Sequence, residues 1–423
     1  MTTSSSKSFK PRKLKLVATK KKLTDAAGLG VMVDLFDESS LSAEFSSCLP
    51  KRLSNRSLGS YRLGLIQLAS FLRGHDCIDD LIELRLDPLL AEVMRGETVL
   101  PRTMGNFLRD FSLQNISAMN RFLSKQSYAY RQHLFEVYPD HFNQPPHYSI
   151  DSTPHEQCGK KMEGLAYNYK DMWCLDSQSI FDEMGFCYGM QLRSGNTKSG
   201  VDAAVLIKNA FKPYDFKDKK YLSADSAYCN QEIIKLCLSQ GITFSIAANQ
   251  ATTYWRDHIE EISHWQPWEY SKEELERAEE KGKDLAEIEL GRFYWQPSWS
   301  ESLRLPIVVK RERLEQATLE DGAYKYYGIV CNHDLFRESL QSIVEHYNRR
   351  GNVENFIREE KYGYDLKHFP CQKLQANHAF GLIAMVANNF LRSIAITDSP
   401  VKTHYAKKIR RKLINKPGHL VRH

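Results

Sequence analysis

The sequence predicts an α/β protein in which an all-helical region precedes a sheet that an insertion interrupts. Up to about residue 136, apolar residues recur at helical spacing. After Pro139, Pro145 and Pro146, short runs of strand type alternate with helical segments. Between residues 250 and 322 this alternation stops, and tryptophan and charged residues dominate. A chain of 423 residues is long enough for two or three domains of this kind.

Both ends of the chain are basic. The net charge is only +6, but residues 7–22 and residues 402–422 each carry eight Lys or Arg and no Asp or Glu. Such ends suit a polyanionic partner, although the first, a predicted flexible arm over residues 1–25, also fits a disordered solubilising tail. The second, a basic tail over 399–423, is interleaved with apolar residues such as Ile409 and Ile414.

Cysteine and apolar patterns predict an intracellular protein. The nine cysteines are scattered singly without a Cys-x-x-Cys spacing, which favours reduced thiols in the cytoplasm and no structural zinc. No apolar run approaches the roughly 18 residues of a membrane span. The lysine-rich N-terminus lacks the apolar segment of a signal peptide. We therefore expect no membrane partner.

Residues 26–140 are predicted to be helical and to bind DNA. Residues 58–72 fit a mostly buried helix ending near Gly74, and shorter helices follow from Ile78 and Pro88. A turn containing Gly96 leads to a helix over 104–111 with Thr103 as a possible N-cap. This outline fits a helix-turn-helix, but many helical bundles look the same. Its DNA-facing side would carry Arg102, Asn106 and Arg109. Another amphipathic helix is predicted over 116–134.

Residues 141–250 are predicted to form the first part of a sheet with acids at strand ends. The strand from His147 ends at Asp151 and breaks at Pro154. Strands over 171–175 and 184–193 follow, then a helix over 201–211 and a strand over 221–225 that ends at Asp225. A helix over 230–239 and a strand over 242–248 complete it. This order is that of a ribonuclease-H-like core, and open α/β sheets bind ligands at strand carboxyl ends.

The sheet is predicted to resume after the insertion. The tryptophan-rich insertion spans 251–322 and contains a strand beginning at Leu305. Residues 323–398 hold the second part of the core, with a strand over 324–331 and a final helix over 376–396. That final helix is apolar nearly all round, which predicts burial.

One long helix from Leu335 to Lys361 is predicted between these two elements. On it Tyr347, Arg350, Glu354 and Lys361 share one stripe. A carboxylate there can hold a divalent cation, and cationic neighbours can hold phosphate oxygens; a solvated charged face is the alternative. A glycine inside a helix is unfavourable, so Gly351 suggests that something approaches the helix closely at this position.

The pattern Tyr-x2-Arg-x3-Glu-x6-Lys at residues 347–361 resembles the signature of DDE transposases of bacterial insertion sequences, the group with the Tyr-Arg-Glu-Lys signature. The resemblance implies two earlier aspartates at strand ends, and Asp151 and Asp225 meet that expectation. It implies that these acids and Glu354 hold two Mg²⁺ or Mn²⁺ ions, with Asp151 bridging. It assigns DNA contacts to Tyr347, Arg350 and Lys361.

The implied function is a transposase that cuts DNA at terminal inverted repeats and joins the element to target DNA. Paired divalent ions suit this chemistry because they stabilise charge on the entering and leaving oxygens. The implied partners are double-stranded DNA and further copies of the chain on paired ends, in a bacterial cytoplasm near the nucleoid. Trp265 or Trp268 could stack on an extruded base, or the tryptophans could form the core of the insertion.

Two alternatives remain open. A non-catalytic sequence-specific DNA-binding protein derived from a transposase would use only the helical region and the basic ends, but it has no need of three acids. A nuclease of the same fold would cut without strand transfer. The long helical region and Lys361 favour end-specific DNA binding over that reading.

Overall fold

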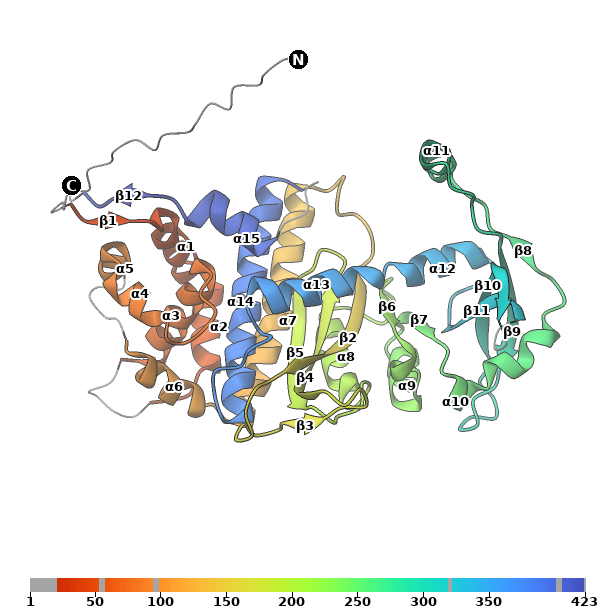
Figure 1. The fold of residues 1–423 in the computed structure, drawn as a ribbon, viewed down its shortest axis with the longest axis horizontal. Coiled ribbons are helices and arrows are strands. Elements are labelled where there is room, and N and C mark those ends of the chain that lie inside the picture. Colours follow the sequence, from red (N-terminus) through yellow and green to blue (C-terminus); the bar gives the residue numbers. More distant parts are fainter. Residues whose placement is uncertain (1–20, 53–57, 94–98, 319–321, 401–404, 422–423) are drawn as a thin grey trace, which may run out of the picture.

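The chain is elongated, and its parts follow one another along the long axis (Figure 1). The computed structural model describes residues 21–52, 58–93, 99–318, 322–400 and 405–421. Most of the predicted arm, the turn at Gly96 and the terminal cations Lys402 and Arg422 lie outside these residues. Helices occupy one end, the sheet lies in the centre, and the insertion lies at the other end.

The N-terminal region is helical, as predicted. Its helices are α1 (Ala27–Asp37), α2 (Leu41–Cys48), α3 (Ser60–Arg73), α4 (Leu81–Leu86), α5 (Pro88–Val93), α6 (Pro101–Arg109) and α7 (Leu113–Val137). Helix α3 ends at Gly74 in the left-handed conformation, with φ of 98°. The predicted N-cap at Thr103 is wrong. Helix α6 begins at Pro101, because proline suits a first turn in which no N–H is needed.

The central strands have the predicted order of three strands, helix, strand, helix, strand. They are β2 (His147–Glu156), β4 (Trp173–Asp182), β5 (Cys187–Ser194), β6 (Tyr221–Ala224) and β7 (Thr243–Ala247), with a short β3 (Ala166–Tyr167) beside β4. Helices α8 (Ala203–Phe211) and α9 (Gln231–Ser239) lie between β5, β6 and β7 in the chain. Strands β2, β4 and β5 are antiparallel neighbours, whereas β2, β6 and β7 are parallel neighbours.

Strand β2 does not end at Asp151, as the sequence suggested. It continues through Pro154 to Glu156 and is paired with β4 from Tyr148 to its end. Its other edge is paired with β6 only as far as Ile150. The Pro154 carbonyl accepts a hydrogen bond from Lys361 instead of a strand partner, so the proline lies where its missing N–H costs no ladder bond.

The insertion continues the same sheet. Strand β7 pairs with β11 (Gly322–Cys331), and β10 (Leu305–Thr318), β9 (Ile288–Trp295) and β8 (Gln266–Pro267) follow in that order. Within the described residues, ten strands thus form one sheet. The insertion also carries α10 (Gln250–Thr253) and α11 (Lys272–Lys281). Helix α11 ends at Lys281, because Gly282 adopts the left-handed conformation that closes it.

The single helix predicted from Leu335 to Lys361 is two helices. Helix α12 (Leu340–Asn348) begins after Ser339, whose side chain caps it, and α13 (Gly351–Gly363) follows a turn at Arg349 and Arg350. Figure 1 shows the pair leading from the insertion back across the central sheet. No described segment approaches Gly351 closely, because apart from its chain neighbours and its own helix no atom lies within 4 Å of the position that a Cβ would take. Close approach there by another molecule stays a prediction.

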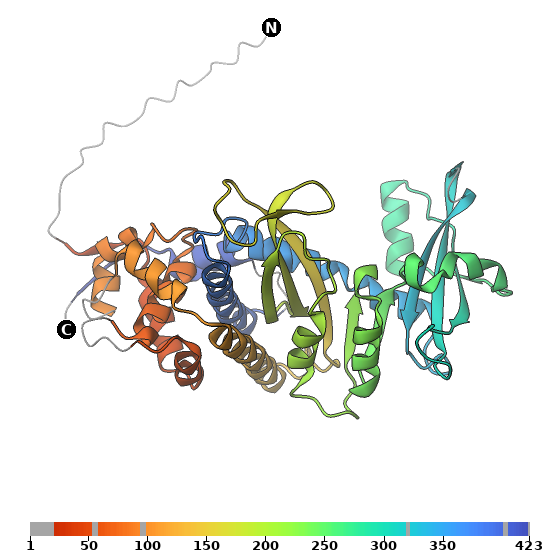
Figure 2. The same ribbon diagram turned by 90° about the horizontal axis from the view of Figure 1, so that it is seen from below.

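Helix α14 (Leu374–Asp398) is buried, as predicted. It is long and apolar enough to span a membrane, but 94% of its apolar window is buried inside the protein. Together with α7 it lies between the N-terminal helices and the sheet (Figure 2). The Asn389 side chain of α14 bonds both backbone groups of Cys187 on β5, at 2.8 Å each. The helical region and the sheet consequently share one hydrophobic core.

The C-terminal segment packs against the N-terminal helices. Helix α15 (Ala406–Ile409) runs into a π-helical turn over Arg410–Ile414, and Ile409 and Ile414 are buried. Strand β12 (Gly418–His419) then pairs with β1 (Leu23–Thr24). The apolar residues interleaved with its lysines therefore hold this segment in place. All nine cysteines lie in the described residues and are free thiols.

Candidate active site

Strand register places Asp151 and Asp225 side by side. Ile150 of β2 lies opposite Ala224 of the parallel β6, and each aspartate is the next residue along its strand. Asp151 accepts a hydrogen bond from the Ser152 backbone N–H at 2.8 Å, and Asp225 accepts one from the Ala227 N–H at 2.9 Å. These bonds fix both carboxylates at the carboxyl end of the parallel strands, where α/β sheets bind their ligands.

Helix α13 supplies the third acid, and Arg350 links all three. Glu354 lies in the first turn of α13, one helical turn after Arg350. The Arg350 Nη2 atom is 2.8 Å from an Asp151 oxygen and 3.9 Å from an Asp225 oxygen, while Nη1 is 3.9 Å from a Glu354 oxygen. The side chains of Asp151, Asp225 and Glu354 are 14%, 34% and 65% exposed. The three predicted acids therefore converge on one guanidinium group.

The acid cluster is short of positive charge. Burial raises the pKa of Asp151 to about 6, and the neighbouring Asp225 carboxylate adds to the rise although Arg350 opposes it. Carboxylate oxygens are ligands that Mg²⁺ and Mn²⁺ accept, and added cations would relieve the desolvated charge of Asp151. The residues present thus fit the ions that the resemblance implies.

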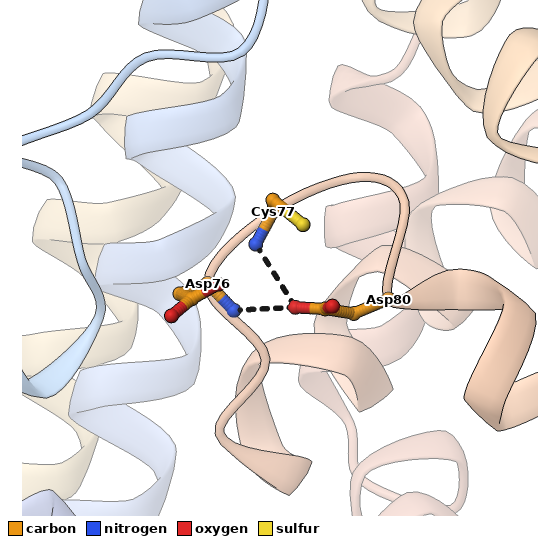
Figure 3. A group of neighbouring side chains, drawn as sticks. All are labelled: Asp76, Cys77 and Asp80. Carbon is orange, nitrogen blue, oxygen red and sulfur yellow. Dashed lines mark hydrogen bonds between the residues drawn. The ribbon is translucent and has the colours of Figure 1, made fainter.

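A second acidic group lies elsewhere. Among the described residues, Asp76, Cys77 and Asp80 are the one set of His, Cys, Asp or Glu whose ligand atoms all lie within 4.8 Å of one another. One Asp80 oxygen accepts the backbone N–H groups of Asp76 and Cys77, at 3.0 and 3.2 Å (Figure 3). Those two bonds are the ones that an aspartate makes when it stabilises a turn, here the turn before α4. They explain why the three residues lie together, so we assign no metal to this group.

Comparison with known proteins identifies the family. The family described as "Transposase DDE domain group 1" matches residues 6–423. The chain belongs to this family of DDE transposases. A search of curated proteins found no match. The match covers nearly the whole chain, so the helical region, the insertion and the C-terminal segment of the transposase all fall within it.

The other residues of the transposase signature are only partly gathered at the acids. Tyr347 is half-buried at the end of α12, where it packs with Ile343 and Val344. The Lys361 ammonium donates to the Pro154 carbonyl at 2.7 Å and thereby ties α13 to β2. Arg350, predicted to hold phosphate, instead contacts the three acids. Its spacing of four residues from Glu354 could have indicated that ion pair.

The predicted DNA-reading residues share one face of α6. Arg102, Asn106 and Arg109 are all exposed there, and Arg109 donates to the Asn106 side chain. The predicted stripe is therefore confirmed as an exposed face. Whether it contacts DNA stays a prediction.

The two tryptophans considered for base stacking contact the protein. The Arg311 guanidinium lies 4.0 Å from the centre of a Trp265 ring, and Trp268 packs against a cluster that includes Leu290 and Val308. Trp255 is buried, at 5% exposure. These contacts fit the structural alternative, and stacking on an extruded base stays an untested prediction.

Sequence reasoning missed a buried carboxyl group beneath the site. Glu360 of α13 is 1% exposed and accepts hydrogen bonds from Ser177 at 3.2 Å and from Ser179 at 3.1 Å, both on β4. Burial raises its pKa from 4.5 to about 7, while the Ser179 and Ser177 hydroxyls and Lys361 lower it. Glu360 thus joins the helix that carries Glu354 to the sheet.

Glu360→Gln should change how stability depends on pH. Because the pKa of Glu360 is higher in the folded state, the folded protein is most stable with Glu360 protonated and loses stability as the pH rises from about 4.5 to 7. Glutamine cannot ionise, so the variant should gain up to about 3 kcal/mol over the wild type at pH 8 and nothing below pH ~4.5. Urea unfolding at several pH values measures this. The exposed Glu273→Gln is the control, and a pH-independent difference for Glu360→Gln would contradict the assignment.

Proposed function

We propose that this transposase cuts DNA at the terminal inverted repeats of a bacterial insertion sequence and joins the cut ends to target DNA. The observation that carries the proposal is the convergence of Asp151, Asp225 and Glu354, from two parallel strands and a helix, on a single Arg350. A protein that only bound DNA would gain nothing from this arrangement, because uncompensated carboxylates repel phosphate.

Asp151, Asp225 and Glu354 would hold two Mg²⁺ or Mn²⁺ ions. Bound there, the ions would activate water or a 3′-hydroxyl and neutralise charge on the phosphate. The chain's own residues orient the acids: the Ser152 and Ala227 N–H groups fix the two aspartates. Arg350 contacts all three carboxylates but offsets only part of their charge. Once cations hold the acids, its guanidinium would be available to a phosphate oxygen.

The catalytic core would be ribonuclease-H-like. Three antiparallel strands followed by two parallel ones, in the spatial order β5-β4-β2-β6-β7, support this assignment. The spacing of Tyr347, Arg350, Glu354 and Lys361 supports the proposal that the protein belongs to the group with the Tyr-Arg-Glu-Lys signature. We further propose that it acts in the bacterial cytoplasm, at the nucleoid, as a homo-oligomer on paired DNA ends, with Arg102, Asn106 and Arg109 of α6 reading the terminal repeat.

Lys361→Ala should weaken binding to the terminal repeat and lower the salt slope of that binding by about one unit. An ammonium has three donors, so the bond to Pro154 leaves Lys361 able to hold a phosphate as well. Fluorescence anisotropy over a range of salt concentrations measures the slope. If the slope stayed that of the wild type while the melting temperature fell, Lys361 would serve only to join α13 to β2.

A strand-transfer assay separates the proposed activity from its alternatives. The protein would be incubated with a duplex that carries the terminal repeat with an exposed 3′-hydroxyl, a supercoiled plasmid as target, and Mg²⁺ or Mn²⁺. Covalent joining of the duplex to the plasmid is the expected result. Metal-dependent nicking without joining would indicate a nuclease of the same fold. Binding with neither product would indicate a protein that only binds DNA.

A further inference from the structure

A cleft of about 970 Å³ lies where three distant segments of the chain meet. Its walls come from the end of α3, the end of α13 and the C-terminal segment around α15. The charged side chains that line it include six cations and two carboxylates. They are Arg73, Lys367, Lys407, Lys408, Arg410 and Arg411, with Asp76 and Asp365.

Buried contacts hold the walls of this cleft together. Arg410 is 4% exposed and donates to the Gly363 carbonyl at 2.6 Å and to the Phe71 carbonyl at 2.8 Å. Its guanidinium also stacks on the Tyr364 ring at 4.7 Å. The Ala406 N–H donates to the Glu359 side chain at 2.5 Å, so α15 is docked on α13. The fold itself therefore forms the cleft, and Arg410 joins the C-terminal segment to α13 and α3.

The rim of the cleft carries cations, some of which form no salt bridge with any described carboxylate. Arg73 is paired with Asp25 at 2.6 Å, and Lys367 is 3.5 Å from Asp365. Lys407, Lys408 and Arg411 are exposed, and no carboxylate of the described residues forms a salt bridge with them. Exposed cations without partners are the groups that release counterions when they bind phosphates.

Aromatic side chains lie beside these cations. Tyr362 and Tyr405 line the cleft and are 57% and 48% exposed. Tyrosine hydroxyl groups donate to phosphate oxygens, and the aromatic rings pack on sugars. A cationic wall with exposed tyrosines therefore favours a nucleic-acid backbone as the occupant.

One face of α13 leads from the acids to the cleft. Glu354, Arg358 and Tyr362 are exposed and follow one another at steps of four residues, so they lie along one side of the helix. Eight residues of helix span about 12 Å, which corresponds to three to four base pairs of B-form DNA. A duplex following this face would pass from the acids over Arg358 into the cleft.

We propose that this cleft binds the phosphate backbone of duplex DNA three to four base pairs from the phosphodiester bond at Asp151, Asp225 and Glu354. The inference deepens the proposed function and rests on it for the position of that bond. The C-terminal segment would thus bind DNA beside the acids. This contact would be separate from the one made by α6, the helix predicted to recognise the terminal repeat. Lys407, Lys408 and Arg411 provide the contacts.

The test compares two triple variants of the full chain. Lys407→Ala, Lys408→Ala and Arg411→Ala together remove the unpaired cations. The control combines Lys272→Ala, Lys281→Ala and Lys283→Ala, on and just after α11, which is rich in glutamate and lies at the other end of the molecule (Figure 1). All six side chains are exposed. Binding to a duplex carrying the terminal repeat is measured in EDTA over a range of salt concentrations, so that no cleavage is needed.

We expect the cleft variant to bind at least about tenfold more weakly near physiological salt and its salt slope to fall by about two to three, with the control unchanged. Equal slopes for the cleft variant and the wild type would overturn the proposal, as would a wild type that binds no duplex. Arg411→Gln alone, expected to lower the slope by about one, replaces the triple variant if that variant has a lowered melting temperature. If the salt slope of the cleft variant falls but the wild type cleaves no DNA, the cleft remains assigned as a DNA-binding site. Only the catalytic proposal is then refuted.

Discussion

Replacing Asp151 with asparagine is expected to lower DNA cleavage at least about a thousandfold while binding to the terminal repeat stays within about twofold. Asp151 is the least exposed of the three acids, and it takes the shortest contact with Arg350, at 2.8 Å. Asparagine keeps the shape of the side chain but removes the charge with which Asp151, in the proposed function, would hold divalent cations. Cleavage of a labelled duplex and anisotropy on the same duplex give the two readouts.

The control for this experiment is Asp284→Asn, which changes an exposed aspartate of the insertion and should leave both readouts unaltered. Cleavage by Asp151→Asn at the rate of the wild type would remove Asp151 from the catalytic set. Loss of both binding and cleavage would instead indicate that Asp151 has a structural role. A substitution that disturbs the sheet should weaken both.

Arg131→Met is expected to lower the free energy of unfolding by about 3–5 kcal/mol. Arg131 of α7 is 1% exposed, and its guanidinium lies 2.5 Å from Glu183 and 3.5 Å from the fully buried Asp182. It also donates to the Gln144 carbonyl at 3.1 Å. Methionine would fill most of the space but would leave the Asp182 carboxylate buried without its cation.

Urea unfolding at neutral pH measures the effect, with Arg121→Met as the matched control on the exposed side of the same helix. The control should change stability by no more than about 0.5 kcal/mol. A loss below about 1 kcal/mol for Arg131→Met would mean that the hydrogen bonds that Asp182 accepts from the Met184 and Phe186 N–H groups suffice to hold it. The position of α7 on the sheet would then depend on its other contacts with β5, such as the bond from the Ser127 hydroxyl to the Cys187 carbonyl and the bond from the Met190 N–H to the Asn120 side chain.

The sequence located the acids through local pattern, but their meeting depends on long-range pairing. A hydrophobic run ending in an aspartate can be recognised in isolation, and this placed Asp225 at the end of its strand. For Asp151 the same rule put the strand end too early, since Pro154 was taken as a break. What decides is that β6 ends at Ala224 and leaves the edge of β2 unpaired beyond Ile150. The paired residues Ile150 and Ala224 are 74 positions apart (224 − 150), and neither segment alone indicates its partner.

Other features could not be read from local pattern for similar reasons. Apolar residues at helical spacing and the lack of a proline suggested one uninterrupted helix, yet α12 begins only after Ser339 and the chain turns at Arg349 and Arg350 before α13. The apolar surface of α14 predicted that the helix is buried but not which elements cover it, because it could pack against any other apolar surface. The cleft at Arg410 unites residues more than 300 positions apart, so only the folded chain shows it.

The most direct test of the central claim is cleavage of a labelled duplex carrying the terminal repeat, with Mg²⁺ or Mn²⁺, by the wild type beside Glu354→Gln. Glu354 is the most exposed of the three acids and lies on a different element from the aspartates, so its loss should disturb the sheet least. We predict metal-dependent nicking at the repeat boundary by the wild type and none by the variant. Tight binding without cleavage by either protein, under both metals, would contradict the claim that the three carboxylates form a catalytic centre.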